Sequence, residues 1–306
     1  MTDQMYVIVV MVPSGAPFNR VLIDNAVSAV HGKVVDAQRV AVPVSLADHR
    51  EVVKFLIDCP DPEILSSQLR QLSDQHRIDI ALQSRLSRCR PYGLAVFDMD
   101  STLIACEVID ELARVAGVGA EVAEITARAM RGELDFDESF RTRLALLKGL
   151  DARAVDVLAE QLPVQSGLRE MTTTLKARGL KLAIFSGGFL PIAERLKNDY
   201  GFDDVVANEL EIRDGKVTGR IVPPIVNREY KAEALGALAG RLGIETDHCI
   251  AVGDGANDLS MMALAGLGIA FHAKPAVRAA SPIEITHIGL DGVCYLMGHE
   301  GEFAAA

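Results

Sequence analysis

Two acidic residues, Asp98 and Asp100, follow a short apolar stretch and are separated by a single residue. Carboxylates at the end of a buried strand can act as nucleophiles, exchange protons or hold a hard cation. A pair with this spacing predicts little by itself, because acidic turns are common and most of them are solvated. Its position directly after the apolar residues 94–97 favours a functional site.

Three further polar segments could complete such a site. Residues 186–189, Ser-Gly-Gly-Phe, can bring backbone N–H groups close to an anion at the start of a helix. Lys231 lies near the beginning of a predicted helix and would count as a surface charge if it stood alone. Residues 253–258 alternate small and polar residues in a tight turn suited to a hard cation. The polar members of this last segment are Asp254, Asn257 and Asp258.

The elements that must position these residues form an α/β pattern. Apolar runs at 94–97, 181–185 and 249–252 each end in a polar loop and are followed by helical periodicity. This order predicts a doubly wound parallel sheet, in which ligands bind at the carboxyl ends of the strands. A helix-rich insertion at about 104–162 predicts a cap. An Asp-Gly pair within 210–222 predicts a hairpin.

A separate module precedes this sheet. Its predicted order is βαββαβ, which is typical of a ferredoxin-like antiparallel sheet with two helices on one face. The predicted strands are 6–12, 34–44, 51–57 and 78–82, and the predicted helices are 19–30 and 62–76. We therefore expect a first domain at 1–84, a linker at 85–92 with a basic cluster and a proline, and a second domain at 93–306.

Composition excludes several classes of function. The 306 residues carry a formal net charge of −11 and no continuous basic stretch, so binding to nucleic acid or to an anionic membrane is not expected. No apolar run reaches the length of a membrane span, and the N-terminus lacks the basic region of a signal peptide. The five cysteines are scattered and odd in number, which favours thiols in a reducing cytoplasm.

In this order, the Asp-x-Asp-Ser-Thr, Ser-Gly-Gly, lysine and Gly-Asp-Gly-Ala-Asn-Asp segments resemble the haloacid dehalogenase-like phosphatase superfamily from about Leu94 onward. The resemblance implies that Asp98 is the nucleophile and Asp100 the general acid and base. It also implies Mg²⁺ held by Asp98, Asp254 and the backbone carbonyl of Asp100, with Asp258 orienting the metal site from behind. The residues implied to bind phosphate or substrate are Ser186, Gly187, Lys231 and Asn257.

The predicted cap resembles that of the phosphoserine phosphatases. By this resemblance Glu107 meets the ammonium of the substrate, Arg143 meets its carboxylate, and Met130 and Phe136 flank them. An arginine can form two N–H bonds to a carboxylate, so the assignment is chemically sensible, and Arg141 is a competing candidate. The implied reaction is hydrolysis of O-phospho-L-serine, the last step of serine biosynthesis. The N-terminal module then resembles an ACT domain, which implies a homodimer and an amino-acid effector such as serine.

Several other functions fit these residues less well, and two stay open. A receiver domain lacks the second acid and the insertion, a P-type ATPase needs membrane spans, and the acid pair disfavours a dehalogenase. A phosphotransferase, or a phosphatase for another small phosphorylated metabolite, stays open because only the acceptor or the substrate differs. A regulatory amino-acid sensor is disfavoured by the intact acid segments and Lys231.

Overall fold

The computed structural model describes residues 5–43, 45–46, 50–131, 133–298 and 302–303, with the side chain of Met130 left out. Its larger sheet has seven strands, six of them parallel, and β8 pairs antiparallel to β7 at one edge. From edge to edge the strands are β11 (Glu284–Ile285), β10 (Leu267–Phe271), β9 (Cys249–Gly253), β5 (Leu94–Phe97), β6 (Lys181–Phe189), β7 (Asp204–Arg213) and β8 (Lys216–Val222). The predicted doubly wound parallel sheet is confirmed.

Both faces of this sheet are covered by helices. Ala95 and Phe97 of β5 point into one core, while Leu94 and Val96 point into the other, so the strand reads as a continuous apolar run. The first core is closed by α8 (Leu168–Ala177), α9 (Leu190–Tyr200) and α13 (Gly292–Leu296). The second is closed by α10 (Arg228–Leu242), α11 (Leu259–Leu264) and α12 (Pro275–Ala280). Short 3-10 turns occupy Thr246–His248 and Ala256–Asp258.

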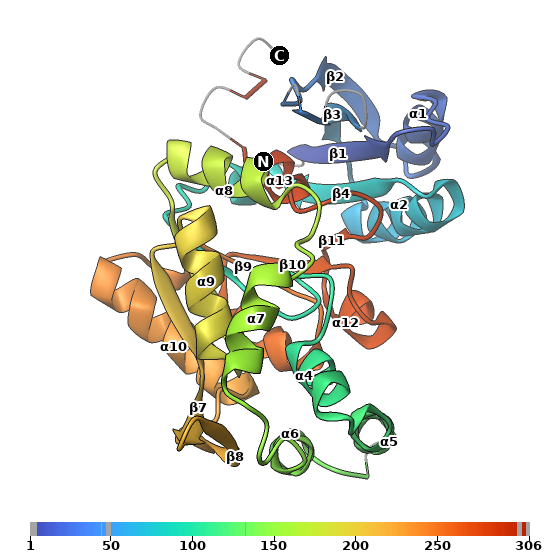
Figure 1. The fold of residues 1–306 in the computed structure, drawn as a ribbon. Coiled ribbons are helices and arrows are strands. Elements are labelled where there is room, and N and C mark those ends of the chain that lie inside the picture. The colour runs from blue at the N-terminus through green and yellow to red at the C-terminus, as the bar shows by residue number, and fades with distance from the viewer. Residues whose placement is uncertain (1–4, 44, 47–49, 132, 299–301, 304–306) are drawn as a thin grey trace.

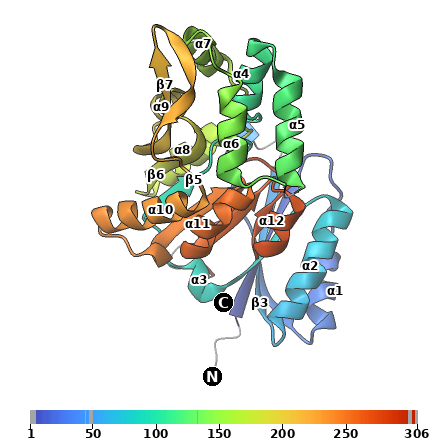
Figure 2. The same cartoon turned by 90° about the horizontal axis from the view of Figure 1, so that it is seen from below.

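Four helices inserted after β5 make the predicted cap, and Figure 2 shows three of them side by side beyond the carboxyl ends of the strands. They are α4 (Val108–Ala116), α5 (Gly119–Met130), α6 (Phe136–Ala145) and α7 (Arg153–Gln161). Helix α6 begins with a capping box, in which Asp135 accepts a bond from the Glu138 N–H. The β7–β8 hairpin turns at Asp214 and Gly215, both with positive φ, as the Asp-Gly pair predicts.

The N-terminal module has the predicted βαββαβ order and lies at the upper right of Figure 1. Its antiparallel sheet runs β2 (Lys33–Arg39), β3 (Arg50–Asp58), β1 (Met5–Pro13), β4 (Asp79–Ser84), with α1 (Val21–Ala29) and α2 (Pro62–His76) on one face. Strand β2 ends before the predicted 34–44, and Val44 lies outside the described residues.

The second face of the N-terminal sheet is also buried. Val7, Val9 and Met11 of β1 belong to the same apolar cluster as Val293 and Leu296 of α13. Ionic contacts add to this interface: the Arg50 guanidinium binds the Asp291 carboxylate at 3.1 Å, and both side chains are buried. The two predicted domains therefore share one apolar core.

The segment expected as a linker, 85–92, is ordered and partly helical. Residues Arg85–Arg88 form α3, capped by the Ser84 hydroxyl, which accepts a bond from the Ser87 N–H. Arg88 is fully buried, which its basic neighbourhood in the sequence does not predict.

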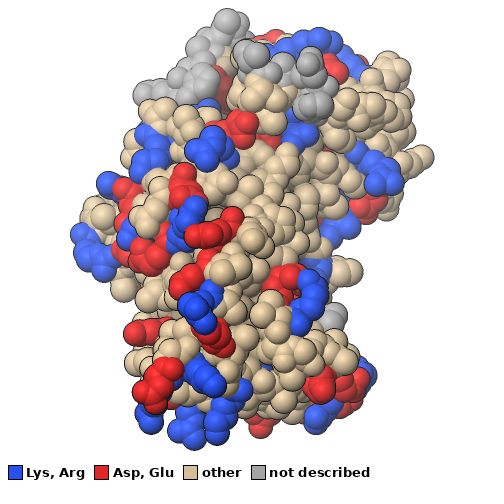
Figure 3. All heavy atoms as spheres, viewed as in Figure 1, with Lys and Arg blue, Asp and Glu red and all other residues tan. Residues whose placement is uncertain are grey.

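Charged side chains of both signs are interspersed on the face drawn in Figure 3, in keeping with the absence of a basic stretch in the sequence. Among the described residues, no helix combines the length and apolarity that crossing a membrane would require.

Candidate active site

Asp98 follows β5 directly, and its backbone N–H donates to the Val252 carbonyl at 2.9 Å, which continues the pairing of β5 with β9. The chain then turns sharply: Ser101 has a φ of 59°, and the N–H groups of 102–104 donate to the Met99 carbonyl. Because of this turn Met99 is buried, and the acids on either side of it both reach the carboxyl end of the sheet.

Lys231 is the central cation of the site. It enters from the first turn of α10, whose Asn227 cap accepts a bond from the Tyr230 N–H at 3.0 Å. Its ammonium donates to Asp98 Oδ1 at 2.5 Å and to Asp258 Oδ1 at 2.7 Å, and its side chain is fully buried. Burial would lower the pKa of Lys231, but the Asp258 and Asp98 carboxylates outweigh it and raise that pKa. Lys231 is therefore charged.

Asp254 and Asp258 come from the loop after β9. A side chain at Gly253 would place its Cβ 2.4 Å from the Asp258 carboxyl carbon, so only glycine admits Asp258 here. Asp258 Oδ2 accepts the Gly255 N–H at 3.0 Å, so both of its oxygens have partners. Asn257 folds over Gly255, with Oδ1 2.2 Å from the position of a Cβ there.

The carboxylates outnumber the cation that binds them. Asp98, Asp254 and Asp258 offer oxygens within 4.8 Å of one another, and all three are buried. Burial, followed by the Asp258 charge, raises the pKa of Asp98 well above its usual range. Burial raises the pKa of Asp254 to about 6, although Lys274, 3.6 Å from its Oδ2, opposes the shift. Clustered, partly desolvated oxygens with excess negative charge fit a hard divalent cation such as Mg²⁺.

Asp100 lies against the Ser-Gly-Gly loop. A Cβ at Gly188 would sit 2.6 Å from Asp100 Oδ2, so the glycine permits this contact. The Val108 N–H donates to Asp100 Oδ1 at 3.2 Å. Burial, and next the Glu107 charge, raise the pKa of Asp100 well above the usual range. Ser186 is fully buried, and its hydroxyl accepts the Gly188 N–H at 2.8 Å.

Asn208 is a residue that sequence reasoning missed. This buried amide donates to the Gly187 carbonyl at 2.7 Å and accepts the Val226 N–H at 2.9 Å. It therefore joins the Ser-Gly-Gly loop to the segment that leads into Lys231. The signal in the sequence is an asparagine directly after the apolar residues 205–207 of β7.

The cap brings its charged residues toward the acids. Glu107, just before α4, accepts the Ser101 hydroxyl at 2.9 Å. Arg143 of α6 is half-buried; burial lowers its pKa, opposed first by the Glu107 charge and then by those of Asp110 and Asp100, so it faces these acids. Arg141 instead lines a separate cavity of about 410 Å³ between α6 and the start of α10.

The aromatic cap residue Phe136 also reaches the Ser-Gly-Gly loop. Its ring edge lies 3.3 Å from where a Cβ would stand on Gly187, and the ring stacks on Phe140 at 6.2 Å. The Met130 side chain lies outside the described residues. The structure thus gathers the other predicted site residues around the carboxyl ends of β5, β6 and β9, beneath the cap.

This site belongs to a known class of hydrolase. Residues 95–263 match the model of the haloacid dehalogenase-like hydrolase family. The chain therefore belongs to this family, as its motifs indicated.

Its relatives define the group more narrowly. The chain is 46% identical over 243 residues to phosphoserine phosphatase SerB2 of Mycobacterium tuberculosis, covering 79% of this chain and 59% of that protein. It is 47% identical over 253 residues to a phosphoserine phosphatase of Vibrio cholerae, covering 83% and 77%. The predicted resemblance to phosphoserine phosphatases is confirmed. The matched region spans about 60% of the length of the mycobacterial relative and of one from Streptomyces coelicolor.

Solved structures agree. A HAD family hydrolase from Salmonella enterica serovar Typhi superposes with a TM-score of 0.86 at 32% identity, over 97% of this chain and 99% of that one. A phosphoserine phosphatase solved as a phospho-aspartyl intermediate analogue matches with a TM-score of 0.64 at 40% identity, over 68% and 99%. The first match includes the N-terminal module, and the second spans about two thirds of this chain.

Proposed function

We propose that this protein is a Mg²⁺-dependent phosphatase that hydrolyses O-phospho-L-serine through a phosphoaspartate on Asp98. The observation that carries the proposal is the buried group of Asp98, Asp258 and Lys231, with the cap's Arg143 near enough for the charges of Glu107 and Asp100 to act on it. A cation and an acid on the cap suit the carboxylate and ammonium of serine, while Lys231 and the Ser-Gly-Gly loop suit its phosphate.

In the first step, a carboxylate oxygen of Asp98 attacks phosphorus and the bond from phosphorus to the serine oxygen breaks. Lys231 holds Asp98 Oδ1 and reduces its repulsion of the phosphate dianion. Ser186 and the Gly187 N–H would contact the nonbridging oxygens. The protonated form of Asp100, favoured by its raised pKa, gives its proton to the departing serine alkoxide.

In the second step, ionised Asp100 takes a proton from water, whose oxygen attacks phosphorus and releases Asp98 and inorganic phosphate. Asp98, Asp254 and the Asp100 carbonyl would hold Mg²⁺, with Asp258 bracing Lys231 and the loop behind them. The ion supplies positive charge that offsets the carboxylates and the phosphoryl oxygens. Asn257 would hydrogen-bond to phosphate or substrate.

The predicted homodimer, serine effector and cytoplasmic location form part of this proposal. In the described sheet, β2 is the more exposed of the two edge strands, so a second copy could pair along it. Size-exclusion chromatography with light scattering tests the dimer, and a monomer at micromolar concentration would contradict it.

Phosphate release from phosphoamino acids, phosphosugars and nucleotides, with Mg²⁺ or with EDTA, tests the function. We expect activity only with Mg²⁺ and a clear preference for O-phosphoserine. A preference for phosphosugars would contradict the roles of Glu107 and Arg143. If phosphate moved from O-phosphoserine to another alcohol faster than to water, the protein would be reassigned as a phosphotransferase.

A further inference from the structure

A second cavity lies at the amino ends of the central strands, whereas the acids lie at the carboxyl ends. Its volume is about 800 Å³, and it is bounded by Tyr92, just before β5, and Leu180, just before β6. Asp98 and Ser186 stand at the other ends of the same two strands, so the sheet separates this cavity from the candidate active site.

The lining of this cavity is strongly basic. Arg85, Arg90 and Arg178 all contribute to its wall, and the carboxylate that shares it belongs to Glu302. The Arg85 guanidinium has no ion-pair partner in the part of the chain that the structure describes. Arg90 lies 3.5 Å from the exposed Asp247, a weak pair in solvent. In a chain with a net charge of −11, this concentration of arginine is a local exception.

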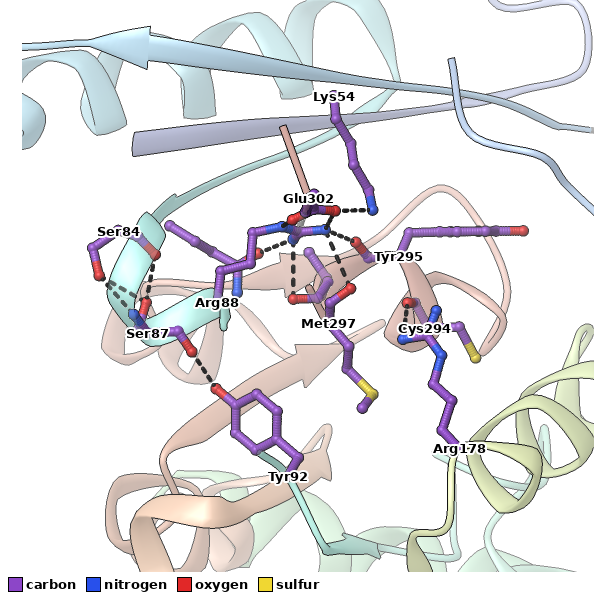
Figure 4. A network of polar contacts seen from close by, with 12 residues as sticks. Lys54, Ser84, Ser87, Arg88, Tyr92, Arg178, Cys294, Tyr295, Met297 and Glu302 are labelled. Carbon is purple, nitrogen blue, oxygen red and sulfur yellow. Dashed lines mark hydrogen bonds and ion pairs between the residues drawn. The ribbon is translucent and has the colours of Figure 1, made fainter. Parts of the chain in front are cut away.

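The Glu302 carboxylate is already neutralised from behind (Figure 4). Its Oε2 accepts Arg88 Nε at 2.6 Å, and its Oε1 accepts Lys54 Nζ at 2.5 Å. Both cations are buried, so two buried positive charges share one buried carboxylate. Burial, and then the Arg88 charge, lower the pKa of Lys54, as expected where cations are in excess.

Backbone carbonyls meet part of this excess. Arg88 also donates to the carbonyl oxygens of Tyr295, Leu296 and Met297 at the end of α13, as Figure 4 shows for the first and last of these. Carbonyl dipoles satisfy hydrogen bonds but carry no net charge. Among the described residues, the positive charge around the cavity is therefore left for an anion to balance.

We propose that this cavity binds a small anion with at least two negative charges, carried by phosphate or carboxylate groups. Arginine guanidinium groups bind both kinds of group through paired N–H donors. The anion would contact α3, the turn before β6 and the chain after α13, which are also held to β3 through Lys54 and Glu302. The site is independent of the proposed phosphatase reaction.

A thiol in the wall provides a site-specific test. Cys89 lines the cavity and is exposed, whereas Cys106 lies next to the candidate active site. The full chain is alkylated with neutral iodoacetamide, with pyrophosphate, citrate or NaCl at equal ionic strength, and peptide mass spectrometry follows each cysteine. We expect pyrophosphate, citrate or both to slow alkylation of Cys89 about tenfold at ten times the dissociation constant. Protection by one anion alone identifies its acidic group.

A double variant, Arg85→Gln with Arg178→Gln, should lose this protection. Arg153→Gln with Arg195→Gln removes the same charge from exposed positions in α7 and α9 and should keep it. The proposal is overturned if neither anion slows Cys89 in the unmodified chain, if only Cys106 is protected, or if protection survives in the Arg85/Arg178 variant. The first two results need no variant, so a folding defect cannot hide them.

Discussion

Opposite excesses of charge are buried at the two ends of the strands in the central sheet: an acidic end at their carboxyl termini and a basic end at their amino termini. At the carboxyl ends of the strands, Asp98, Asp254 and Asp258 surround Lys231. At the other end, Lys54 and Arg88 share Glu302.

The difference lies in how each excess is compensated. Arg88 finds carbonyl oxygens at the end of α13, and both oxygens of Glu302 are used, so removing that acid breaks a structural contact. At the acids after β5 and β9, burial first and then the neighbouring Asp258 charge raise the pKa of Asp98 and of Asp254, and a bound cation would relieve this repulsion. The acidic cluster thus keeps a repulsion that a cation would relieve, whereas Glu302 joins β3, α3 and the chain after α13.

At the acidic end, replacing the nucleophile should have the largest effect on activity. Asp98→Asn removes the attacking carboxylate, so kcat for O-phosphoserine should fall roughly 10⁴-fold or more. Asp214→Asn, on the exposed hairpin turn where asparagine tolerates the positive φ, is the matched control and should keep full activity. Substantial turnover by Asp98→Asn in a phosphate-release assay would refute the mechanism.

At the basic end, neutralising Glu302 should lower the stability of the protein and not its activity. Glu302→Gln leaves Lys54 and Arg88 buried without a carboxylate, so the free energy of unfolding should fall by about 3 kcal/mol. Urea denaturation followed by circular dichroism measures this change. Glu209→Gln, at an exposed position in β7, should change stability by no more than about 0.5 kcal/mol. Equal stability of the two variants would show that the buried pairs contribute nothing.

Replacing arginines of α6 by lysine separates recognition of the substrate carboxylate from the effect of positive charge alone at the acidic end. Arg143→Lys keeps the positive charge but loses the paired N–H donors, so kcat/KM for O-phosphoserine should fall about 10- to 100-fold. Arg141→Lys, on the same helix but in the neighbouring cavity, should have little effect. If the two variants changed places, the carboxylate assignment would move to Arg141.

At the basic end, the contact of Glu302 with Arg88 and Lys54 should weaken in acid. Burial would raise the pKa of Glu302, but the hydrogen bond and charge of Arg88 and the contact with Lys54 lower it overall. A lowered carboxyl pKa stabilises the fold above the unfolded value near 4.5, and this contribution is lost as the pH falls through the lowered value. Thermal unfolding of the unmodified chain should therefore lose more stability below about pH 4.5 than unfolding of Glu302→Gln. Parallel curves would contradict this linkage.

The smallest expected effect concerns the stability of the acidic end without metal. Without metal, Asp98→Asn relieves repulsion among the buried acids and should raise the midpoint of thermal unfolding by about 2 °C, equivalent to about 1 kcal/mol. Added Mg²⁺ should stabilise the unmodified chain more than the variant. A variant less stable than its parent in EDTA would mean that the Asp98–Lys231 bond outweighs the repulsion.

Local signals made much of the molecule predictable. Pro62 at the first turn of α2 and the apolar period behind it set that helix, and the Asp-Gly pair set the hairpin. The pattern placed the acids and Lys231 at the ends or beginnings of elements, whereas their predicted roles rested on the resemblance to the haloacid dehalogenase-like phosphatases.

Residues whose role depends on distant partners were not predictable. Arg88 reads as part of a basic linker because its carboxylate partner, Glu302, lies 214 positions further along the chain. Asn208 likewise gains its meaning only when β7 brings it between Gly187 and Val226.

The shared core of the N-terminal sheet has a consequence for synthesis on the ribosome. The apolar face of β1 is covered by α13, and Lys54 meets an acid 248 positions later, so this face stays exposed while most of the chain is being made. Helices α1 and α2 can cover the other face early. The nascent chain would thus leave this face of the N-terminal sheet exposed until α13 has been synthesised, and transiently exposed apolar surface makes a folding chain prone to aggregation.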